Sequence, residues 1–148
     1  MERLIGLIGV LAASVAWGTT VPLDGTWRLD YFPQPLDGAV RTVPLAPAVG
    51  AKTVSATVPG NCELDLVNAG ILPPLEVGLN VLKLRPYEAY QWLYTKEFVA
   101  PAVAVKAGEK AELVFGGIDT LADVFLNGEK VGESANMLIE HRFDVTRK

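Results

Sequence analysis

The sequence is poor in the residues that build disulfides and metal sites. Its 148 residues include one cysteine, Cys62, and one histidine, His141. A single cysteine excludes an intrachain disulfide, and we interpret Cys62 as a small buried hydrophobic residue. Because the two residues lie 79 positions apart, they give no recognisable metal-ligand spacing. We therefore predict neither a metal site nor a cofactor.

Basic charge is also scarce. The chain has 13 Lys and Arg against 17 Asp and Glu, and its formal net charge is −4. No basic stretch is longer than a pair. This charge argues against a nucleic-acid or anionic-membrane partner.

The sequence lacks a hydrophobic run long enough to span a membrane, which takes about 20 residues. Its N-terminus carries a shorter one, since residues 4–17 are uncharged and mostly apolar and follow Arg3. This pattern predicts a bacterial-type signal peptide over residues 1–18 and a periplasmic or extracellular domain over residues 19–148, with no membrane anchor after cleavage. The alternative interpretation is a buried N-terminal helix or strand.

The remainder is built of short segments with alternating polarity and frequent Gly and Pro. Alternation predicts strands, listed by residue number as 26–29, 53–58, 91–99, 112–115, 122–126, 129–131 and 139–145. Residues 62–69 predict a short helix with Asn61 as N-cap, Gly70 after its end, and Leu64, Leu66 and Val67 facing inward. We expect loops at residues 32–50 and 72–88 and a turn at residues 107–110. The pattern is typical of an all-β, antiparallel β-sandwich with one short helix.

The clearest local signal is Asn127-Gly128, which follows an apolar segment. Both residues tolerate the positive φ that a type I′ hairpin turn requires. The sequence therefore predicts a tight hairpin at this point, with the return strand starting at Glu129.

Several short motifs occur in one order along the chain. They are Thr57-Val58-Pro59-Gly60 with Leu64-Asp65-Leu66, Ala69-Gly70-Ile71-Leu72-Pro73-Pro74 with Gly78-Leu79-Asn80, Trp92-Leu93-Tyr94 with Phe98, Gly116-Gly117-Ile118-Asp119-Thr120 with Val124-Phe125-Leu126-Asn127-Gly128, and Asn136-Met137-Leu138 with Phe143-Asp144-Val145-Thr146. Together they resemble the N-terminal, so-called sugar-binding β-sandwich domain of glycoside hydrolase family 2, in its β-mannosidase-like branch. The sequence departs from the family where a tryptophan usually precedes the first motif, and where Pro73-Pro74-Leu75 lacks the family's acid.

The resemblance implies a jelly-roll, galactose-binding-like sandwich that is incomplete in this chain, because several strands normally follow the last motif. It also implies a secreted, retaining, exo-acting glycosidase whose catalytic glutamates lie in a later barrel domain. Retaining hydrolysis needs two carboxyl groups about 5 Å apart, and the sequence supports no such pair. We therefore assign no catalytic residue and expect the chain alone to be inactive. We expect the longer enzyme to bind a glycan substrate through the missing catalytic domain.

The loop at residues 72–88 holds the best candidates for substrate contact. We predict that Asn80, Arg85, Tyr87 and Glu88 bind substrate, whereas Trp92 and Tyr94 belong to the core because they alternate within a strand. Two other interpretations stay open: a free-standing carbohydrate-binding or adhesion module without catalysis, and an inert truncated product with unpaired sheet edges.

Overall fold

The computed structural model describes residues 3–6, 20–34, 50–100 and 109–148. Within these ranges the chain forms eight strands and two short helices, which confirms the predicted all-β class. The strands are β1 (Arg3–Gly6), β2 (Gly25–Pro33), β3 (Lys52–Val58), β4 (Tyr90–Val99), β5 (Glu112–Phe115), β6 (Ala122–Leu126), β7 (Glu129–Ser134) and β8 (His141–Asp144). The helices are α1 (Cys62–Asn68) and the 3₁₀ helix η1 (Asn80–Tyr87).

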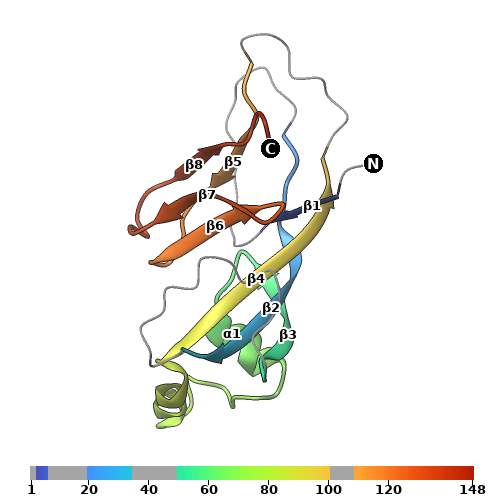
Figure 1. The fold of residues 1–148 in the computed structure, drawn as a ribbon. Coiled ribbons are helices and arrows are strands. Elements are labelled where there is room, and N and C mark those ends of the chain that lie inside the picture. Colours follow the sequence, from blue (N-terminus) through green and yellow to red (C-terminus); the bar gives the residue numbers. More distant parts are fainter. Residues whose placement is uncertain (1–2, 7–19, 35–49, 101–108) are drawn as a thin grey trace.

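The strands form two antiparallel sheets (Figure 1). Six of them lie in the order β3-β2-β4-β1-β6-β7, and β5 pairs with β8 in a second sheet. In the large sheet, β1 lies between β4 and β6 and joins its two halves.

The first core lies on the face of the β3-β2-β4 half that α1 covers. Alternation along β2 turns Trp27 and Leu29 to this face, where they pack with Ala56 and Val58 of β3. All four side chains are buried, and the indole N–H of Trp27 donates to the carbonyl of Leu23 at 2.7 Å. The predicted alternation of β2 and β3 is therefore confirmed.

The second core lies between the two sheets. Leu113 and Phe115 of β5 pack against Val124 of β6, with Phe143 of β8 partly buried beside them. Because these residues come from both sheets, the fold is a sandwich, as predicted. Leu23 contacts both cores and so links them.

The helix α1 has the predicted ends, and Leu66 and Val67 face inward as predicted, whereas Leu64 does not. The Asn61 side chain accepts the Leu64 N–H at 2.8 Å, and Gly70 has φ +70°. The N–H groups of Gly70 and Ile71 return to carbonyls of the last turn, as in a Schellman motif. Leu64, predicted to face inward, is 53% exposed, and Asp65 is buried with Leu66 instead, because the Asp65 carboxylate accepts the Thr57 N–H of β3.

The predicted hairpin is confirmed. Asn127 has φ 50° and Gly128 has φ 83°, both in the left-handed region that a type I′ turn needs. Leu126 of β6 pairs with Glu129 of β7 across the turn.

Three boundaries differ from the prediction. The expected loop at residues 72–88 contains η1, an eight-residue helix whose 3₁₀ period leaves no amphipathic signal in the sequence. β2 continues through Phe32 to Pro33, which pairs with Tyr90, because a proline is tolerated at the end of a strand. The last strand is shorter than predicted, and Ile139 lies outside it, half-exposed.

Some predictions fall on residues outside the described ranges. They are most of the predicted signal peptide, most of the loop at residues 32–50, and the start of the turn at residues 107–110. Residues 3–6 of the predicted signal form β1, as the alternative of an N-terminal strand would require. Cleavage of this segment is not tested by the fold, so the signal peptide stays a prediction.

Candidate functional site

The four residues predicted to bind substrate lie on or next to one element. Asn80, Arg85 and Tyr87 belong to η1, and Glu88 is its C-cap. Since a 3₁₀ helix has three residues per turn, side chains three positions apart line up along it. Arg85 and Glu88 therefore share one line, and both are exposed. Tyr87 lies on another line, which packs against the core.

Asn80 has a structural task in this arrangement. Its side-chain amide donates to the carbonyl of Pro74 at 2.9 Å, and its backbone N–H donates to the carbonyl of Val77 at 3.1 Å. These bonds close the turn that leads into η1. Contact of Asn80, Arg85, Tyr87 or Glu88 with a substrate stays a prediction.

Tyr87 belongs to a cluster of four aromatic rings at this end of the domain. Tyr31 stacks on Trp92 with ring centroids 5.6 Å apart, and Tyr87 lies 5.2 Å from Tyr90 and 6.2 Å from Tyr31. Trp92 packs against the buried residues of the core, which confirms its predicted core role. Because its rings pack against one another, the cluster anchors η1 to the sheet rather than offering a free stacking face.

The hydroxyl of Tyr31 is the unusual atom of this cluster. Tyr31 is 1% exposed, and its hydroxyl has no hydrogen-bond partner within the described ranges. Burial raises the pKa of Tyr31, and the neighbouring Tyr87 and Tyr90 raise it further, so the group stays a neutral phenol.

We expect Tyr31→Phe to stabilise the chain by about 1 kcal/mol, because it removes a buried polar group that has no partner. Urea unfolding of the parent and the variant measures this difference. Tyr90→Phe, which changes a half-buried phenol of the same cluster, is the matched control and should be close to neutral. A loss of stability in Tyr31→Phe would mean that the hydroxyl has an acceptor.

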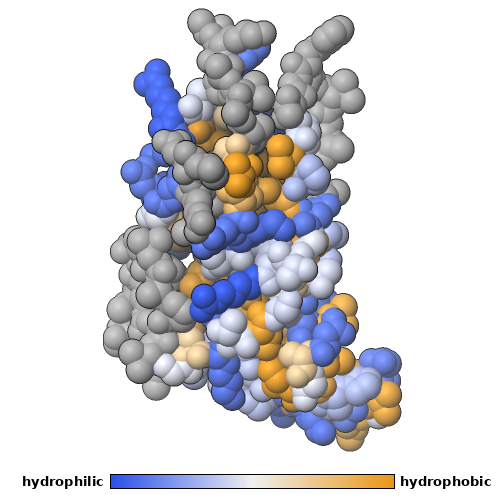
Figure 2. Space-filling model, turned by 90° about the vertical axis from the view of Figure 1, so that its right-hand side faces the viewer, coloured by the Kyte–Doolittle hydropathy of each residue, from blue (hydrophilic) through white to orange (hydrophobic). Residues whose placement is uncertain are grey.

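Hydrophobic side chains are exposed around η1. Leu79 is 76% exposed, Val77 57%, Val81 51% and Leu82 46%, and η1 itself has no buried residue. In Figure 2 hydrophobic atoms reach the surface at the bottom of the molecule, where this segment lies. A helix that shows this much apolar surface is typical of one that contacts another protein part.

Seven carboxylates of the described residues are held in ion pairs. Asp123 and Glu133 come nearest to a catalytic pair, because they face each other across β6 and β7. Lys130 lies 2.6 Å from one and 2.8 Å from the other, and all three are exposed. The other ion pairs are Arg28 with Asp30, Arg142 with Glu112 and Glu140, Lys110 with Asp144, and Lys148 with Glu129. These ion pairs lie on the surface of the domain. They do not place one carboxyl group as an acid and another as a nucleophile around a cleft.

A serine and the histidine also come together, but not as a catalytic pair. His141 Nε2 lies 2.9 Å from Ser134 Oγ and 2.7 Å from the carbonyl oxygen of Asn136. A carbonyl can only accept, so Nε2 carries the hydrogen and cannot act as a base toward Ser134. Ser134 Oγ donates to the carbonyl of Thr120. The group therefore fixes the turn between β7 and β8, and His141 is a hydrogen-bonded strand residue.

A buried acidic group lies under α1. Asp65 is 2% exposed, and its Oδ1 accepts the Thr57 N–H at 2.9 Å. Burial raises the pKa of Asp65, and it also raises the pKa of Tyr94 beside it. Burial, together with Glu63, raises the pKa of the Cys62 thiol to about 12, so the group stays a neutral thiol at pH 7, and Cys62 is half-buried rather than fully buried as predicted. The motif around Asp65 is a structural joint between β3 and α1.

One shallow depression lies on the β3-β2-β4 half of the large sheet. Its volume is about 620 Å³, and its lining includes Arg28, Ser55 and Thr95, which are register neighbours on three strands. Because the depression is open, we interpret it as a solvent-exposed face of the sheet. Within the described ranges, no three His, Cys, Asp or Glu side chains gather as metal ligands, and no helix is long and apolar enough to cross a membrane.

Sequence reasoning missed the sheet side of the aromatic cluster. The prolines that predict a loop from residue 32 onward hide Tyr31, although Tyr31 continues the alternation of Trp27 and Leu29. The alternation along β2 is the signal in the sequence that indicates Tyr31 as a core residue.

Comparison with known proteins identifies the kind of domain. Residues 45–148 match the family described as the glycosyl hydrolase 2 galactose-binding domain-like family. Over 126 residues the chain is 41% identical to beta-mannosidase B of Thermothelomyces thermophilus, covering 85% of this chain and 13% of that protein. It is 27% identical over 135 residues to the beta-mannosidase of Mus musculus, covering 91% of this chain and 13% of that protein. The chain thus spans about an eighth of the length of these relatives.

Proposed function

This chain belongs to the glycosyl hydrolase 2 galactose-binding-like domain family, and from this premise we propose that it is the scaffold domain of a longer, exported β-mannosidase-like enzyme. The observation that carries the proposal is the match of residues 45–148 together with relatives named β-mannosidase, of whose length the matched part covers 13%. The proposed enzyme is a retaining, exo-acting glycosidase of carbohydrate metabolism.

The chemistry of this enzyme comes from outside the described residues. Retaining hydrolysis uses one carboxyl group as nucleophile and one as acid and base, about 5–5.5 Å apart. In the scaffold the facing acids Asp123 and Glu133 are both bound by Lys130 on an exposed surface. We assign the two catalytic carboxyl groups to another domain of the longer protein.

We assign the η1 end of the scaffold as the surface that contacts the catalytic domain and the substrate. Its exposed Val77, Leu79, Val81 and Leu82 would pack against the catalytic domain. Arg85 and Glu88 continue the line of Leu79 and Leu82 toward the end of η1, so they would lie at the edge of that contact and reach a glycan. The aromatic cluster behind η1 holds this surface in place.

We further propose that the protein is exported to the periplasm or beyond the cell, because residues 4–17 have the composition of a signal peptide. A free-standing carbohydrate-binding module is the second candidate. It is less well supported, because the aromatic rings that would stack on a sugar pack against one another and against the core.

The test is a specificity panel with the full-length protein. We expect hydrolysis of a chromogenic β-mannoside with a kcat/KM at least tenfold above that for the matching β-galactoside and β-glucuronide. A preference for either of the other sugars would reject the β-mannosidase branch while keeping the family. Absence of hydrolysis of all three, with binding of this chain to a glycan array, would favour the binding module.

A further inference from the structure

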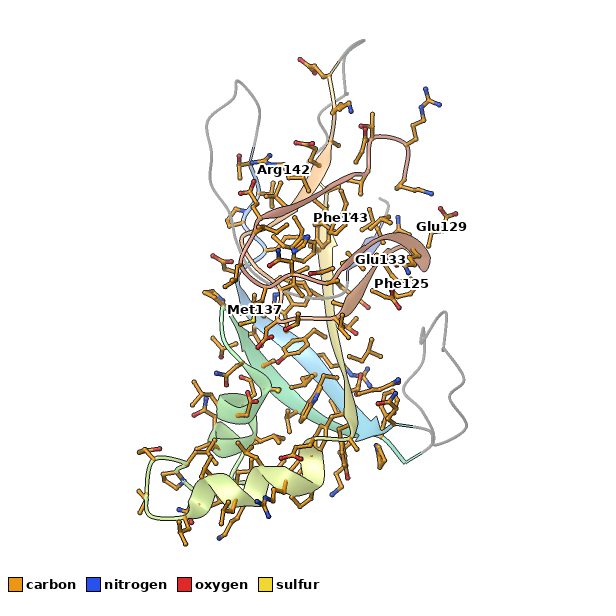
Figure 3. The ribbon with its side chains drawn as sticks, turned by 90° about the vertical axis from the view of Figure 1, so that its left-hand side faces the viewer. Phe125, Glu129, Glu133, Met137, Arg142 and Phe143 are labelled. Atoms are coloured by element: carbon orange, nitrogen blue, oxygen red, sulfur yellow. The ribbon has the colours of Figure 1, made fainter. Side chains whose placement is uncertain are left out.

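The turn between β6 and β7 carries a chemically reactive pair of residues, Asn127 and Gly128. Asn127 is exposed and Gly128 is half-exposed, so water reaches both. Figure 3 shows the next residue, Glu129, at the outer edge of the domain. Glycine has no Cβ to shield its backbone nitrogen, whereas the other four asparagines each precede a residue with a side chain, namely Cys62, Ala69, Val81 and Met137. Asn127 is therefore the asparagine whose side-chain amide is followed by an unhindered backbone nitrogen.

The reaction open to this pair is deamidation through a cyclic imide. The backbone nitrogen of Gly128 attacks Cγ of Asn127, so that the N–Cγ bond forms and the Cγ–Nδ2 bond breaks. Nδ2 leaves as ammonia and takes the proton of the Gly128 N–H with it. Water then opens the five-membered ring. Opening at Cγ gives aspartate with the normal backbone, and opening at the main-chain carbonyl carbon gives isoaspartate, whose backbone runs through Cβ. Only water is consumed, and no atom is oxidised or reduced.

The folded turn holds the reacting nitrogen away from Cγ. The imide ring contains the Cα–C bond of Asn127, so closing it makes Cβ eclipse the Gly128 nitrogen. This eclipsed arrangement corresponds to ψ of about −120° at Asn127, as at the first central residue of a type II′ turn, whereas a type I′ turn has about +30° there. The observed φ values of 50° at Asn127 and 83° at Gly128 are those of type I′. Ring closure therefore requires the peptide plane between the two residues to flip.

Gly128 allows this flip, but the flipped turn is a minor conformer. A type II′ turn has negative φ at its second central position, and glycine adopts either sign of φ. Only the minor conformer can close the ring, so the rate in the folded protein falls by the fraction of that conformer. A fraction of about 0.1–10% slows the reaction about 10- to 1,000-fold relative to a chain in which this bond rotates freely.

The isoaspartyl product does not fit the turn. It adds one backbone atom between Leu126 and Glu129, whose pairing closes a two-residue loop. Leu126 is 3% exposed and Val124 is fully buried, so a changed register of β6 against β7 would displace side chains of the core. Aspartate at position 127, the other product, keeps the normal backbone and tolerates positive φ.

We propose that Asn127 is a deamidation site that the type I′ turn protects in the folded domain, and that its conversion to isoaspartate in the unfolded chain prevents the native β6–β7 pairing from forming again. The modification would record the time that the chain spends unfolded and would make its unfolding progressively irreversible. The inference is independent of the proposed function.

The rates of deamidation in the folded and the unfolded protein test the protection. The full-length protein is incubated at neutral pH in buffer and in urea, in water labelled with heavy oxygen, beside a synthetic peptide of residues 122–131. Ring opening adds one oxygen atom from water, so the label marks product formed during the incubation. The tryptic peptide of residues 111–130 contains Asn127 as its one asparagine. We expect similar rates in urea and in the synthetic peptide, and a rate at least tenfold lower in buffer.

Two matched controls accompany this measurement. Asn61 and Asn136, which precede Cys62 and Met137, should stay unconverted in the same digests. Asn127→Asp carries the normal aspartyl product from the start. After urea is removed, this variant should recover slow hydrogen exchange in β6 and β7 as the unconverted parent does, whereas the parent should lose that protection in proportion to its isoaspartyl content.

Three results would overturn the proposal. If Asn127 did not convert in the unfolded protein, it would not be a deamidation site. If it converted in buffer less than tenfold more slowly than in urea, the turn would not protect it. If the isoaspartyl protein regained the slow exchange of β6 and β7, the modification would not prevent the native pairing. None of these readouts depends on hydrolysis of a glycoside.

Discussion

Replacing Gly132 by alanine is expected to destabilise the domain by about 2–3 kcal/mol, a large effect for the addition of one methyl group. Gly132 lies in β7 and pairs with Val124, which is fully buried. A Cβ at this position would come within 2.1 Å of two ring carbons of Phe143. The added methyl group would therefore collide with the ring that packs β8 against the large sheet.

The Phe143 ring has little room to move aside. Its centroid lies 5.8 Å from that of Phe115, edge to face, and 6.3 Å from the His141 ring, which stacks parallel to it (Figure 3). His141 is itself held by Ser134 and by the Asn136 carbonyl. A shift of the ring thus disturbs both the second core and the β7–β8 turn.

Urea unfolding of the parent and Gly132→Ala measures the loss. The double variant Gly132→Ala with Phe143→Leu is the matched control, because a smaller side chain should recover part of the cost and give a coupling energy above about 0.5 kcal/mol. If the single variant unfolded within about 0.5 kcal/mol of the parent, the packing of β8 over Gly132 would be wrong.

The second large expected effect is on the free energy of unfolding and concerns Asp65, for which two substitutions should have opposite outcomes. Asp65→Ala is expected to cost about 2–3 kcal/mol, because the Thr57 N–H loses its acceptor at a buried position. Asp65→Asn keeps that acceptor and replaces Oδ2, which is buried without a hydrogen-bond partner within the described ranges, by a neutral amide group. At neutral pH we expect the asparagine variant to be at least as stable as the parent.

The reason is the direction of the pKa shift. Burial raises the pKa of Asp65, and neither the hydrogen bond from the Thr57 N–H nor the nearby Tyr94 outweighs it. An acid whose pKa is higher in the folded state binds its proton more tightly there. Its contribution to stability is therefore complete below its unfolded pKa of about 4 and is lost as the pH rises through the folded value.

The measurement is the free energy of unfolding of parent and Asp65→Asn from about pH 3 to pH 7. The difference should grow with pH in favour of the variant, by about 1.4 kcal/mol for each unit by which the folded pKa exceeds the unfolded one. The other titrating groups are common to both proteins, so the difference isolates Asp65. A constant difference, or one that favours the parent at pH 7, would contradict a buried acid with a raised pKa.

The features that the sequence predicts well depend on local chemistry. Asn127-Gly128 dictates its turn because few residues tolerate positive φ, and Asn61 and Gly70 fix the ends of α1 by the bonds that they make or permit. The inner face of α1 could not be predicted in the same way. Asp65 is buried in place of Leu64 because of a backbone N–H on β3, a partner that no periodicity reveals.

The candidate site was predicted in part. Arg85 and Glu88 could be selected as polar groups in a loop, but their alignment required the 3₁₀ helix, whose short period leaves no pattern in the sequence. The anchoring of Tyr87 by Tyr31 depends on residues 56 positions apart, brought together by the pairing of β2 with β4. The sequence motifs that carry the family resemblance lie on β3, β4, β6 and β8 and on the turns and helix caps of the scaffold.

The central claim is that this domain organises a glycosidase and contributes no catalytic carboxyl group. Hydrolysis of a chromogenic β-mannoside by the purified chain of residues 1–148, beside the full-length protein at equal molar concentration, tests it most directly. We predict turnover by the full-length protein and none above buffer by the chain alone, although it unfolds cooperatively. Turnover by the chain alone, abolished by Asp123→Asn or Glu133→Gln, would contradict the claim and place the chemistry within the scaffold.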